Sequence, residues 1–316
     1  MNQRYQNAAT DGTKSPILSI NYSNRLLDSE SPVYKTERDG VYLVRVNGSE
    51  KDISYFIDNK IDEIKNILSV DDNSEIAILV RNERTQRIID ESLTTPHRLV
   101  CTTKLDSDLN PRSRLYALLL HFYFDERIPF LSILDGYIDY DMLSTFTKQR
   151  LHEESEIIKS IPNEEMDELI VHFKSIADII LPKIQEGSSM LRLRDVLSNN
   201  KELESYKPLQ SDEIQLMTLH KSKGLEFDIV FHLNMCEWEL PFKIIEDDDF
   251  NNPLYPNWEQ DLNLHYVGVT RARKACFLVR GTQRTNSKDM LKNARDSEFL
   301  SLNGIEALRK DVCYGF

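Results

Sequence analysis

The sequence predicts an α/β protein, in which a mostly parallel β-sheet is flanked by helices and carries an inserted all-helical subdomain. Short β-rich runs alternate with helical patterns in residues 1–104 and again in residues 210–316. This alternation is typical of strands joined by helical crossovers. Residues 105–209 have helical periodicity and no convincing strand. We therefore expect one α/β domain formed by the two outer regions, with the middle region as its insertion.

Four strands and two helices are predicted in the first region. The strands are short apolar and β-branched runs at 16–20, 41–46, 76–81 and 98–102. A helix is predicted over 50–68, because its apolar residues recur at helical spacing on one side: Ile53, Phe56, Ile57, Ile61, Ile64, Ile67 and Leu68. A second helix is predicted over 83–93.

The strand–helix pattern returns in the last region. Strands are predicted at 215–219, 228–233 and 275–280, with a helix that begins near Trp258 and a last helix over about 296–309. Between the two α/β regions, the segments RSRLYALLLHFYF and NEEMDELIVHFKSIADIILPKI have the apolar spacing of packed helices.

Composition limits the function classes. The four cysteines lie far apart without a CxxC pair, which argues against a zinc site or a disulfide framework and predicts a reducing, cytoplasmic environment. No apolar run approaches the ~18 residues that span a membrane, so no membrane partner is expected. The net charge of −13 does not exclude a nucleic-acid partner, because phosphate binding depends on where the positive charges lie.

Two segments carry the functional signal. The first, IQLMTLHKSKGLEFDIVF, runs from Ile214 to Phe231 as a strand, a polar turn and a second strand. The second, DLNLHYVGVTRARKACFLV, runs from Asp261 to Val279 as a helix that ends near Arg271 and is followed by a strand. An arginine at such a junction can project into a cleft, where its planar fork suits phosphate oxygens.

Together these segments resemble motifs V and VI of the UvrD/Rep-type superfamily 1 DNA helicases. TLHKSKGLEFDIVF is similar to the motif V pattern TLHxAKGLEFxxVF, and YVGVTRA to the motif VI pattern YVAxTRA. MCEWELPF, at 235–242, looks like the family segment MxEGxFP. Upstream, LSINYSN at 18–24 is similar to motif IV, LxxNYRS, and MNQRY at 1–5 to the tail of motif III.

The resemblance implies that the α/β part is the second RecA-like (P-loop NTPase-type) domain of the family, called 2A. The helical insertion stands in the place of domain 2B and looks shorter than usual. None of the ten glycines is followed by lysine, so the sequence has no P-loop. In the family the P-loop and the Walker B carboxylates belong to domain 1A. The resemblance therefore implies ATP as cofactor, with Mg²⁺ supplied by a 1A domain, and no cofactor for the isolated chain.

For the nucleotide side, the resemblance implies roles for three residues. Arg271 matches the arginine finger that contacts the γ-phosphate, Glu226 matches the glutamate that meets the ribose, and Gly224 permits the turn between the strands. Two structural alternatives stay open. Arg271 can be a surface arginine that caps the C-terminus of a helix, and Glu226 can be a solvated acid in a loop.

The upstream matches add three nucleotide-side residues. Tyr22 matches the tyrosine that stacks on adenine, with a tyrosine packed at a strand end as the alternative, and Gln3 matches the motif III glutamine. The sequence departs from the family at Ser23, where motif IV has an arginine. Unless Arg25 substitutes for that arginine, we expect weakened hydrolysis.

For the DNA side, the resemblance implies phosphate contacts from Thr218 and His220, with Lys221 and Ser222 beside them. Lys221 and Lys223 are equally well explained as solvated lysines.

Two functional interpretations follow. In the first, the chain is the C-terminal half of a UvrD-like ATP-dependent DNA helicase or translocase, is inactive as an ATPase alone, and works on single-stranded or partly duplex DNA with a 1A domain in cis or in trans. In the second, it is a non-catalytic, helicase-derived binding or regulatory module that acts with a partner chain, such as a nuclease or another effector in a defence system. Repair and defence are both open as pathways.

Overall fold

A computed structural model describes residues 40–246, 253–301 and 310–314 of the chain. The predicted strand at 16–20 and the candidate residues Gln3, Tyr22 and Arg25 lie outside these residues. The described chain divides into two compact units. One contains the residues up to Val100 and those from Gln210 onward, and the other runs from Cys101 to Leu209.

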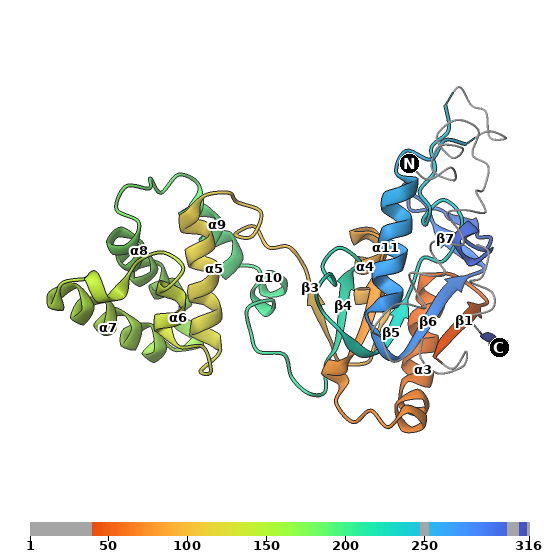
Figure 1. The fold of residues 1–316 in the computed structure, drawn as a ribbon, viewed down its shortest axis with the longest axis horizontal. Coiled ribbons are helices and arrows are strands. Elements are labelled where there is room, and N and C mark those ends of the chain that lie inside the picture. Colours follow the sequence, from red (N-terminus) through yellow and green to blue (C-terminus); the bar gives the residue numbers. More distant parts are fainter. Residues whose placement is uncertain (1–39, 247–252, 302–309, 315–316) are drawn as a thin grey trace. The chain divides into compact units, whose positions relative to one another are not determined.

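Among the described residues of the first unit, seven strands form one sheet in the order β3-β4-β2-β5-β6-β1-β9 (Figure 1). Every pairing in this sheet is parallel. The strands are β1 Val41–Val46, β2 Ile76–Val80, β3 His97–Val100, β4 Ile214–Thr218, β5 Phe227–His232, β6 Ala272–Gly281 and β9 Lys310–Tyr314. The predicted α/β fold is confirmed, and β1 to β6 lie where the sequence predicts strands.

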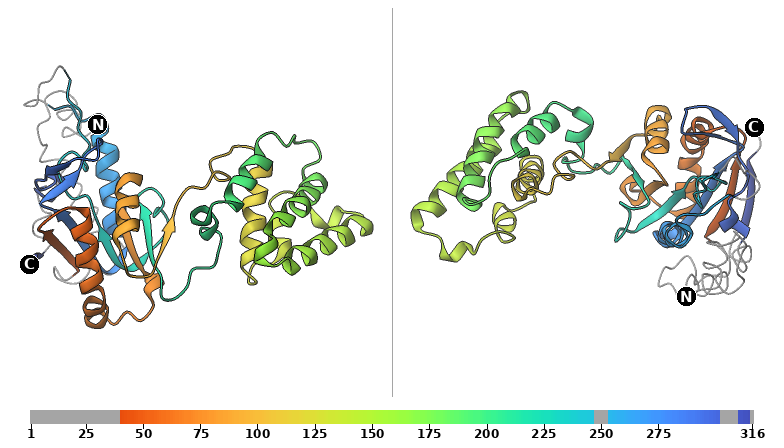
Figure 2. Two further views of the ribbon diagram at one scale, coloured as in Figure 1. Left: turned by 180° about the vertical axis from the view of Figure 1, so that it is seen from behind. Right: turned by 90° about the horizontal axis from the view of Figure 1, so that it is seen from above.

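Helices cover both faces of this sheet. All residues of the central strand β2 are buried, and successive side chains point to opposite faces. Ala77 packs in the cluster that contains residues of α11 (Trp258–Thr270). Ile78 packs in the cluster that contains residues of α3 (Glu50–Leu68) and α4 (Glu83–Ser92). The view from above accordingly shows α11 on one side of the strands and α3 and α4 on the other (Figure 2).

Polar residues fix where these helices begin. The backbone N–H of Ser49 donates to Asp52 Oδ2 at 2.7 Å, which forms part of a capping box at the start of α3. At α4, Asn82 Oδ1 accepts from the backbone N–H of Thr85 at 2.9 Å. Each contact satisfies a backbone group that the first helical turn leaves without a partner.

The region after β6 differs from the prediction. Residues 283–293 form a hairpin of β7 (Gln283–Thr285) and β8 (Leu291–Asn293), which their polar sequence did not indicate. Glu50 holds this hairpin, because its carboxylate accepts the backbone N–H and the hydroxyl of Thr285, both at 2.9 Å. In the described part of the predicted last helix, only the short 3₁₀ segment Glu298–Ser301 forms, and residues 302–309 lie outside the described residues.

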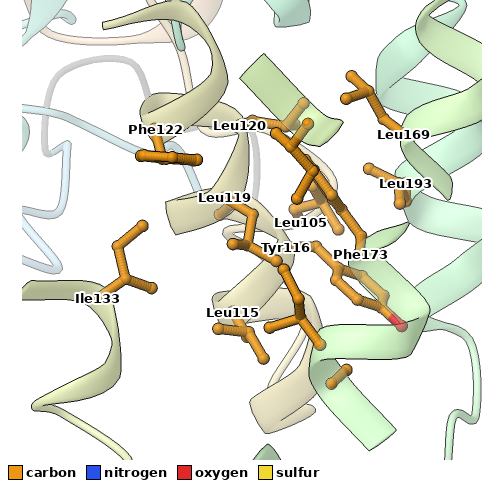
Figure 3. Close-up of a cluster of buried hydrophobic side chains, with 14 of the residues drawn as sticks. Leu105, Leu115, Tyr116, Leu119, Leu120, Phe122, Ile133, Leu169, Phe173 and Leu193 are labelled. Carbon is orange, nitrogen blue, oxygen red and sulfur yellow. The ribbon is translucent and has the colours of Figure 1, made fainter. Parts of the chain in front are cut away.

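The second unit is all-helical, as predicted. Its helices are α5 Pro111–Phe124, α6 Phe130–Leu134, α7 Thr145–Ser160, α8 Leu169–Ile180, α9 Ser189–Leu197 and α10 Asn200–Glu204. The core surrounds Tyr116 of α5, whose ring stacks on Phe173 of α8 with centroids 6.2 Å apart (Figure 3). The Tyr116 hydroxyl donates to Glu186 Oε1 at 2.7 Å, so the polar tip of this buried side chain has a partner.

Two features are absent from the described part of the chain. No helix there has both the length and the apolar character needed to cross a membrane. Those residues also contain no group of three or more His, Cys, Asp or Glu side chains placed to hold a metal ion.

Candidate functional site

The polar turn at 219–226 connects opposite edges of the sheet. It leaves β4 after Thr218 and enters β5 at Phe227, and both strands are parallel to β2, which lies between them. The turn must therefore lead the chain back from the carboxyl ends of the parallel strands, here called the carboxyl edge, to their amino ends, the amino edge. As a result, Thr218 and His220 lie at the carboxyl edge, whereas Glu226 lies at the amino edge.

Arg271 meets this turn at the amino edge. It follows the last residue of α11, and its Nε donates to the carbonyl oxygen of Val267 at 3.1 Å. Its Nη1 donates to the carbonyl oxygen of Leu225 at 2.8 Å, and its own carbonyl oxygen accepts the backbone N–H of Phe227 at 2.8 Å. The guanidinium thus caps the end of α11, which is the structural alternative to a phosphate contact, and it does so beside Glu226.

The conformation of the turn depends on Gly224. Its φ is +88°, in the region that residues with a Cβ rarely adopt. A Cβ placed there would meet no atom within 4 Å, so the requirement for glycine comes from the backbone and not from crowding. The side chain of Glu226, two residues later, is exposed. A carboxylate in this position can accept hydrogen bonds from a ligand at the amino edge.

At the carboxyl edge, His220 is exposed and Thr218 is half-buried. The pKa of His220 is lowered, mainly by partial burial of the ring and to a smaller extent by the positive charge of Arg81. The imidazole is therefore neutral at pH 7 and offers one N–H donor. His220 and Lys223 also line a cavity of about 470 Å³ between the turn and α11.

The structure places Ser222, an expected phosphate contact, in the interior of the turn. The side chain has no exposed surface, and its hydroxyl donates to the carbonyl oxygen of Leu219 at 2.9 Å. Ser222 therefore stabilises the turn and is not available to a phosphate. Its neighbour Lys221 is half-buried, so it remains a candidate contact.

A buried pair of histidines joins β5 to α11. His232 Nε2 of β5 lies 3.1 Å from His265 Nδ1 of α11. Both side chains are almost completely buried, and burial lowers the pKa of His232 to about 4. Burial, together with His232, lowers the pKa of His265 as well. The pair is consequently neutral, and it couples the position of α11 to the sheet.

A second cavity at the carboxyl edge was missed in the sequence. It has a volume of about 500 Å³ and lies where the chain leaves β2, β5 and β6. Four of its lining residues are cationic and one is acidic: Arg81, Arg84, Lys243 and Arg284 against Glu239. We call this the carboxyl-edge pocket. Its other lining residues are Asn82, Trp238, Phe242, Asn257, Asn286 and Ser287.

Three of the four cations in the carboxyl-edge pocket have acidic partners. Arg81 Nη2 lies 2.9 Å from Oδ1 of the fully buried Asp261, whose Oδ2 accepts the backbone N–H of Phe242. Arg284 Nη1 lies 3.6 Å from Glu239, and Lys243 is held by two glutamates at 3.2 and 2.8 Å. No ion pair of Arg84 was found among the described residues. Carboxylates therefore hold and balance three cations of the pocket wall, and the Arg84 guanidinium is the one cation of that wall without an ion pair among the described residues.

Trp238 has a strained backbone in this pocket. Its φ is +74°, which for a bulky side chain costs roughly 1–3 kcal/mol. The neighbouring Glu239 is largely enclosed, and burial raises the pKa of its carboxyl group. Sequence signals for the pocket exist: Arg81 and Arg84 follow a buried strand, and Trp238 stands where the MxEGxFP segment has glycine. These signals do not predict a pocket, because no single segment of the sequence contains it.

Comparison with known proteins finds similarity in the part of the chain that contains the turn at 219–226 and Arg271. The family described as UvrD-like helicase C-terminal domain matches residues 137–282. The chain is 42% identical over 101 residues to the ATP-dependent DNA helicase Rep of Buchnera aphidicola subsp. Acyrthosiphon pisum, which is 32% of this chain and 14% of that protein. It is 31% identical over 153 residues to DNA helicase II of Rickettsia typhi, which is 48% of this chain and 20% of that protein. Rep of Escherichia coli is 40% identical over 82 residues, which is 26% of this chain and 10% of that protein. The matched segments therefore span only a small part of these helicases.

Proposed function

Since this chain carries the UvrD-like C-terminal domain of the UvrD/Rep-type superfamily 1 DNA helicases, we propose that it forms one wall of an ATP site and part of a single-stranded DNA track. The other wall belongs to a 1A domain with a P-loop, which acts in cis or in trans. In this arrangement the chain by itself does not hydrolyse ATP.

The contact of Arg271 with the residues on either side of Glu226 carries this proposal. Leu225 accepts from the Arg271 guanidinium and Phe227 donates to the Arg271 carbonyl, each at 2.8 Å. Arg271, proposed for the phosphate, and Glu226, proposed for the ribose hydroxyls, therefore lie at one hydrogen-bonded junction at the amino edge. This placement supports a shared ligand that has both chemical groups.

Arg271 acts as an arginine finger in this proposal. Its bonds to the Val267 and Leu225 carbonyls hold the guanidinium ready at the domain surface. When the 1A domain closes with ATP and Mg²⁺ bound, the guanidinium exchanges a carbonyl partner for the γ-phosphate. An arginine finger of this kind contributes about 10³–10⁵ in rate by stabilising the charge of the transition state.

The DNA track lies at the carboxyl edge. Thr218, His220 and Lys221 contribute a hydroxyl, a neutral N–H donor and a positive charge to phosphates there. The turn at 219–226 joins this edge to the nucleotide edge in eight residues, because it runs from the end of β4 to the start of β5. A change in the ligand at one edge is therefore transmitted to the other through a short, hydrogen-bonded segment.

ATP turnover with and without the partner domain tests the proposal. We expect no turnover from the isolated chain with single-stranded DNA, and DNA-stimulated turnover when a 1A domain is supplied as a separate chain or within one polypeptide. Turnover by the isolated chain would contradict the proposal, because a single wall cannot bind the nucleotide phosphates and Mg²⁺.

One observation favours a second candidate, the non-catalytic binding or regulatory module. Arg271 already has carbonyl partners for Nε and Nη1, so a structural role explains its contacts without a nucleotide. In that case the partner is a nuclease or another effector, and addition of a 1A domain produces no DNA-stimulated turnover. The same experiment therefore separates the two functions.

A further inference from the structure

We propose that the carboxyl-edge pocket binds one nucleotide of single-stranded DNA, stacks its base on Trp238 and prefers a base with an exocyclic amino group. This inference rests on the proposed function, because it assigns base recognition to one point of the DNA track. One of the residues concerned, Trp238, stands where the resembled segment pattern, MxEGxFP, has glycine.

The charges of the pocket suit a phosphate. Four cationic side chains and one carboxylate line it, although the whole chain has a net charge of −13. Arg81 and Lys243 are fixed by acidic partners that also balance their charges, so they shape the pocket wall without adding net positive charge. Arg84 projects from the first turn of α4 into the same pocket, where its charge acts on Glu239 but, among the described residues, it forms no ion pair. Arg84 is therefore the residue we assign to a backbone phosphate.

The aromatic side chains suit a base. Trp238 and Phe242 line the pocket, are joined by a backbone bridge, and Phe242 is 42% exposed. The Lys243 ammonium lies 5.7 Å from the centre of the Trp238 ring and is itself buried, so it holds the indole in place. Stacking on an aromatic ring is the usual way in which proteins bind an unpaired base.

The backbone conformation at Trp238 favours glycine over tryptophan. Its φ of +74° is relaxed for glycine and strained for tryptophan. The MxEGxFP pattern has glycine at this position. Tryptophan therefore carries a backbone cost here, and its place on the pocket wall lets the indole stack on a bound base.

Glu239 provides the preference among bases. Its Oε2 accepts from Asn82 Nδ2 at 2.8 Å, whereas Oε1 lies 3.6 Å from Arg284, beyond hydrogen-bond distance. Oε1 is therefore an acceptor at the pocket wall without a hydrogen bond to Arg284. A carboxylate accepts from the N4 amino group of cytosine, and thymine has no amino group to offer. We therefore expect cytosine to bind better than thymine.

Binding of labelled homopolymers to the full chain tests this inference. Fluorescence anisotropy would compare oligo(dC) with oligo(dT) of equal length at one salt concentration. We expect roughly fivefold tighter binding of oligo(dC), and loss of that difference in Glu239→Gln, whose amide can both donate and accept. Equal affinities for the two oligomers in the unmodified chain would overturn the inference and leave the proposed function standing. Absence of binding to either oligomer would overturn both.

Trp238→Gly separates stacking from folding. Because glycine relaxes the backbone at this φ, we expect no loss of thermal stability, together with roughly tenfold weaker binding of oligo(dC). Phe146→Ala, which removes an exposed aromatic side chain in the helical unit, is the control and should bind as the unmodified chain does. Unchanged affinity in Trp238→Gly would overturn the stacking role.

Arg84 and Arg87 form a matched pair for the phosphate contact. Both lie on α4, but only Arg84 lines the pocket. Arg84→Gln should weaken binding of both homopolymers and reduce the salt dependence of affinity, whereas Arg87→Gln should change neither. Equal effects of the two substitutions would overturn the assignment of a phosphate to Arg84.

Discussion

The guanidinium of Arg271 lies 2.8 Å from the carbonyl oxygen of Leu225. This bond joins the end of α11 to the turn that precedes β5, although 46 positions in the sequence separate the two residues. The bond matters because of Glu226, which lies between Leu225 and Phe227. The side chain of Glu226 is exposed, and both of its neighbours are hydrogen-bonded to Arg271. The geometry of one predicted nucleotide contact therefore depends on the other.

Removal of the Arg271 side chain should have a small effect on folding. Arg271→Ala loses the bonds to the Val267 and Leu225 carbonyls, and we expect the free energy of unfolding to fall by about 1 kcal/mol. Urea denaturation measures this change. Arg87→Ala, at an exposed position on α4, is the control, with an expected change within about 0.5 kcal/mol. A loss of several kcal/mol in Arg271→Ala would show that the side chain serves mainly to hold the fold together.

Gly224→Ala tests the turn. Alanine at a φ of +88° is strained, and we expect destabilisation of about 1–2 kcal/mol in urea. The space around the position is open, so no steric cost is added. Gly136→Ala is the matched control: the nearest atom to its added Cβ is 4.0 Å away, and a neutral or slightly stabilising effect is expected. Equal effects of the two substitutions would show that Gly224 does not need its conformation.

Ser222 and Lys221 are neighbours with opposite predicted effects. Ser222→Ala removes a buried hydroxyl that donates to Leu219, so we expect about 1 kcal/mol lower stability and unchanged DNA affinity. Lys221→Ala should leave stability unchanged and weaken binding to all DNA sequences alike, with a smaller salt dependence. Weaker DNA binding in a folded Ser222→Ala would restore the original expectation for Ser222.

The buried histidine pair predicts a dependence of stability on pH. The pKa of His232 in the folded protein is about 4, below the ordinary value of 6.5, so the unfolded chain binds a proton more readily. Stability should therefore be full above pH 6.5 and fall as the pH drops toward 4, by at most about 1.4 kcal/mol per pH unit for each histidine. Urea midpoints at pH 7.5 and 5 measure the fall. His232→Gln should flatten this dependence and His152→Gln, at an exposed position, should not.

Much of the fold could be predicted from the sequence because burial imposes periodicity. The apolar residues of α3 recur every three or four positions because one face packs on the sheet, and β2 is apolar throughout because both of its faces are covered. The β7–β8 hairpin could not be predicted in this way. Its strands are exposed and polar, and Glu50, which holds Thr285, lies 235 positions away in the sequence.

The candidate site, like the fold, could be predicted from the sequence only in part. The resemblance to motifs V and VI assigned Glu226 and Arg271 to the nucleotide side, but the sequence could not indicate which side chains of the turn at 219–226 point inward. Ser222 is buried and Lys223, its neighbour, is exposed, because their directions depend on local turn geometry that residue types do not specify. The carboxyl-edge pocket was missed for a related reason. Its residues follow three different strands and meet only when the sheet has formed.

The rate of DNA-stimulated ATP hydrolysis in Arg271→Ala, with the 1A domain supplied, tests the central claim most directly. If Arg271 is the arginine finger, kcat should fall by about 10³-fold or more while DNA affinity and the folded structure are retained, and Arg87→Ala should keep the full rate. If Arg271→Ala folds, binds DNA and hydrolyses ATP at the unmodified rate, the guanidinium only caps α11, and the proposed nucleotide wall is wrong.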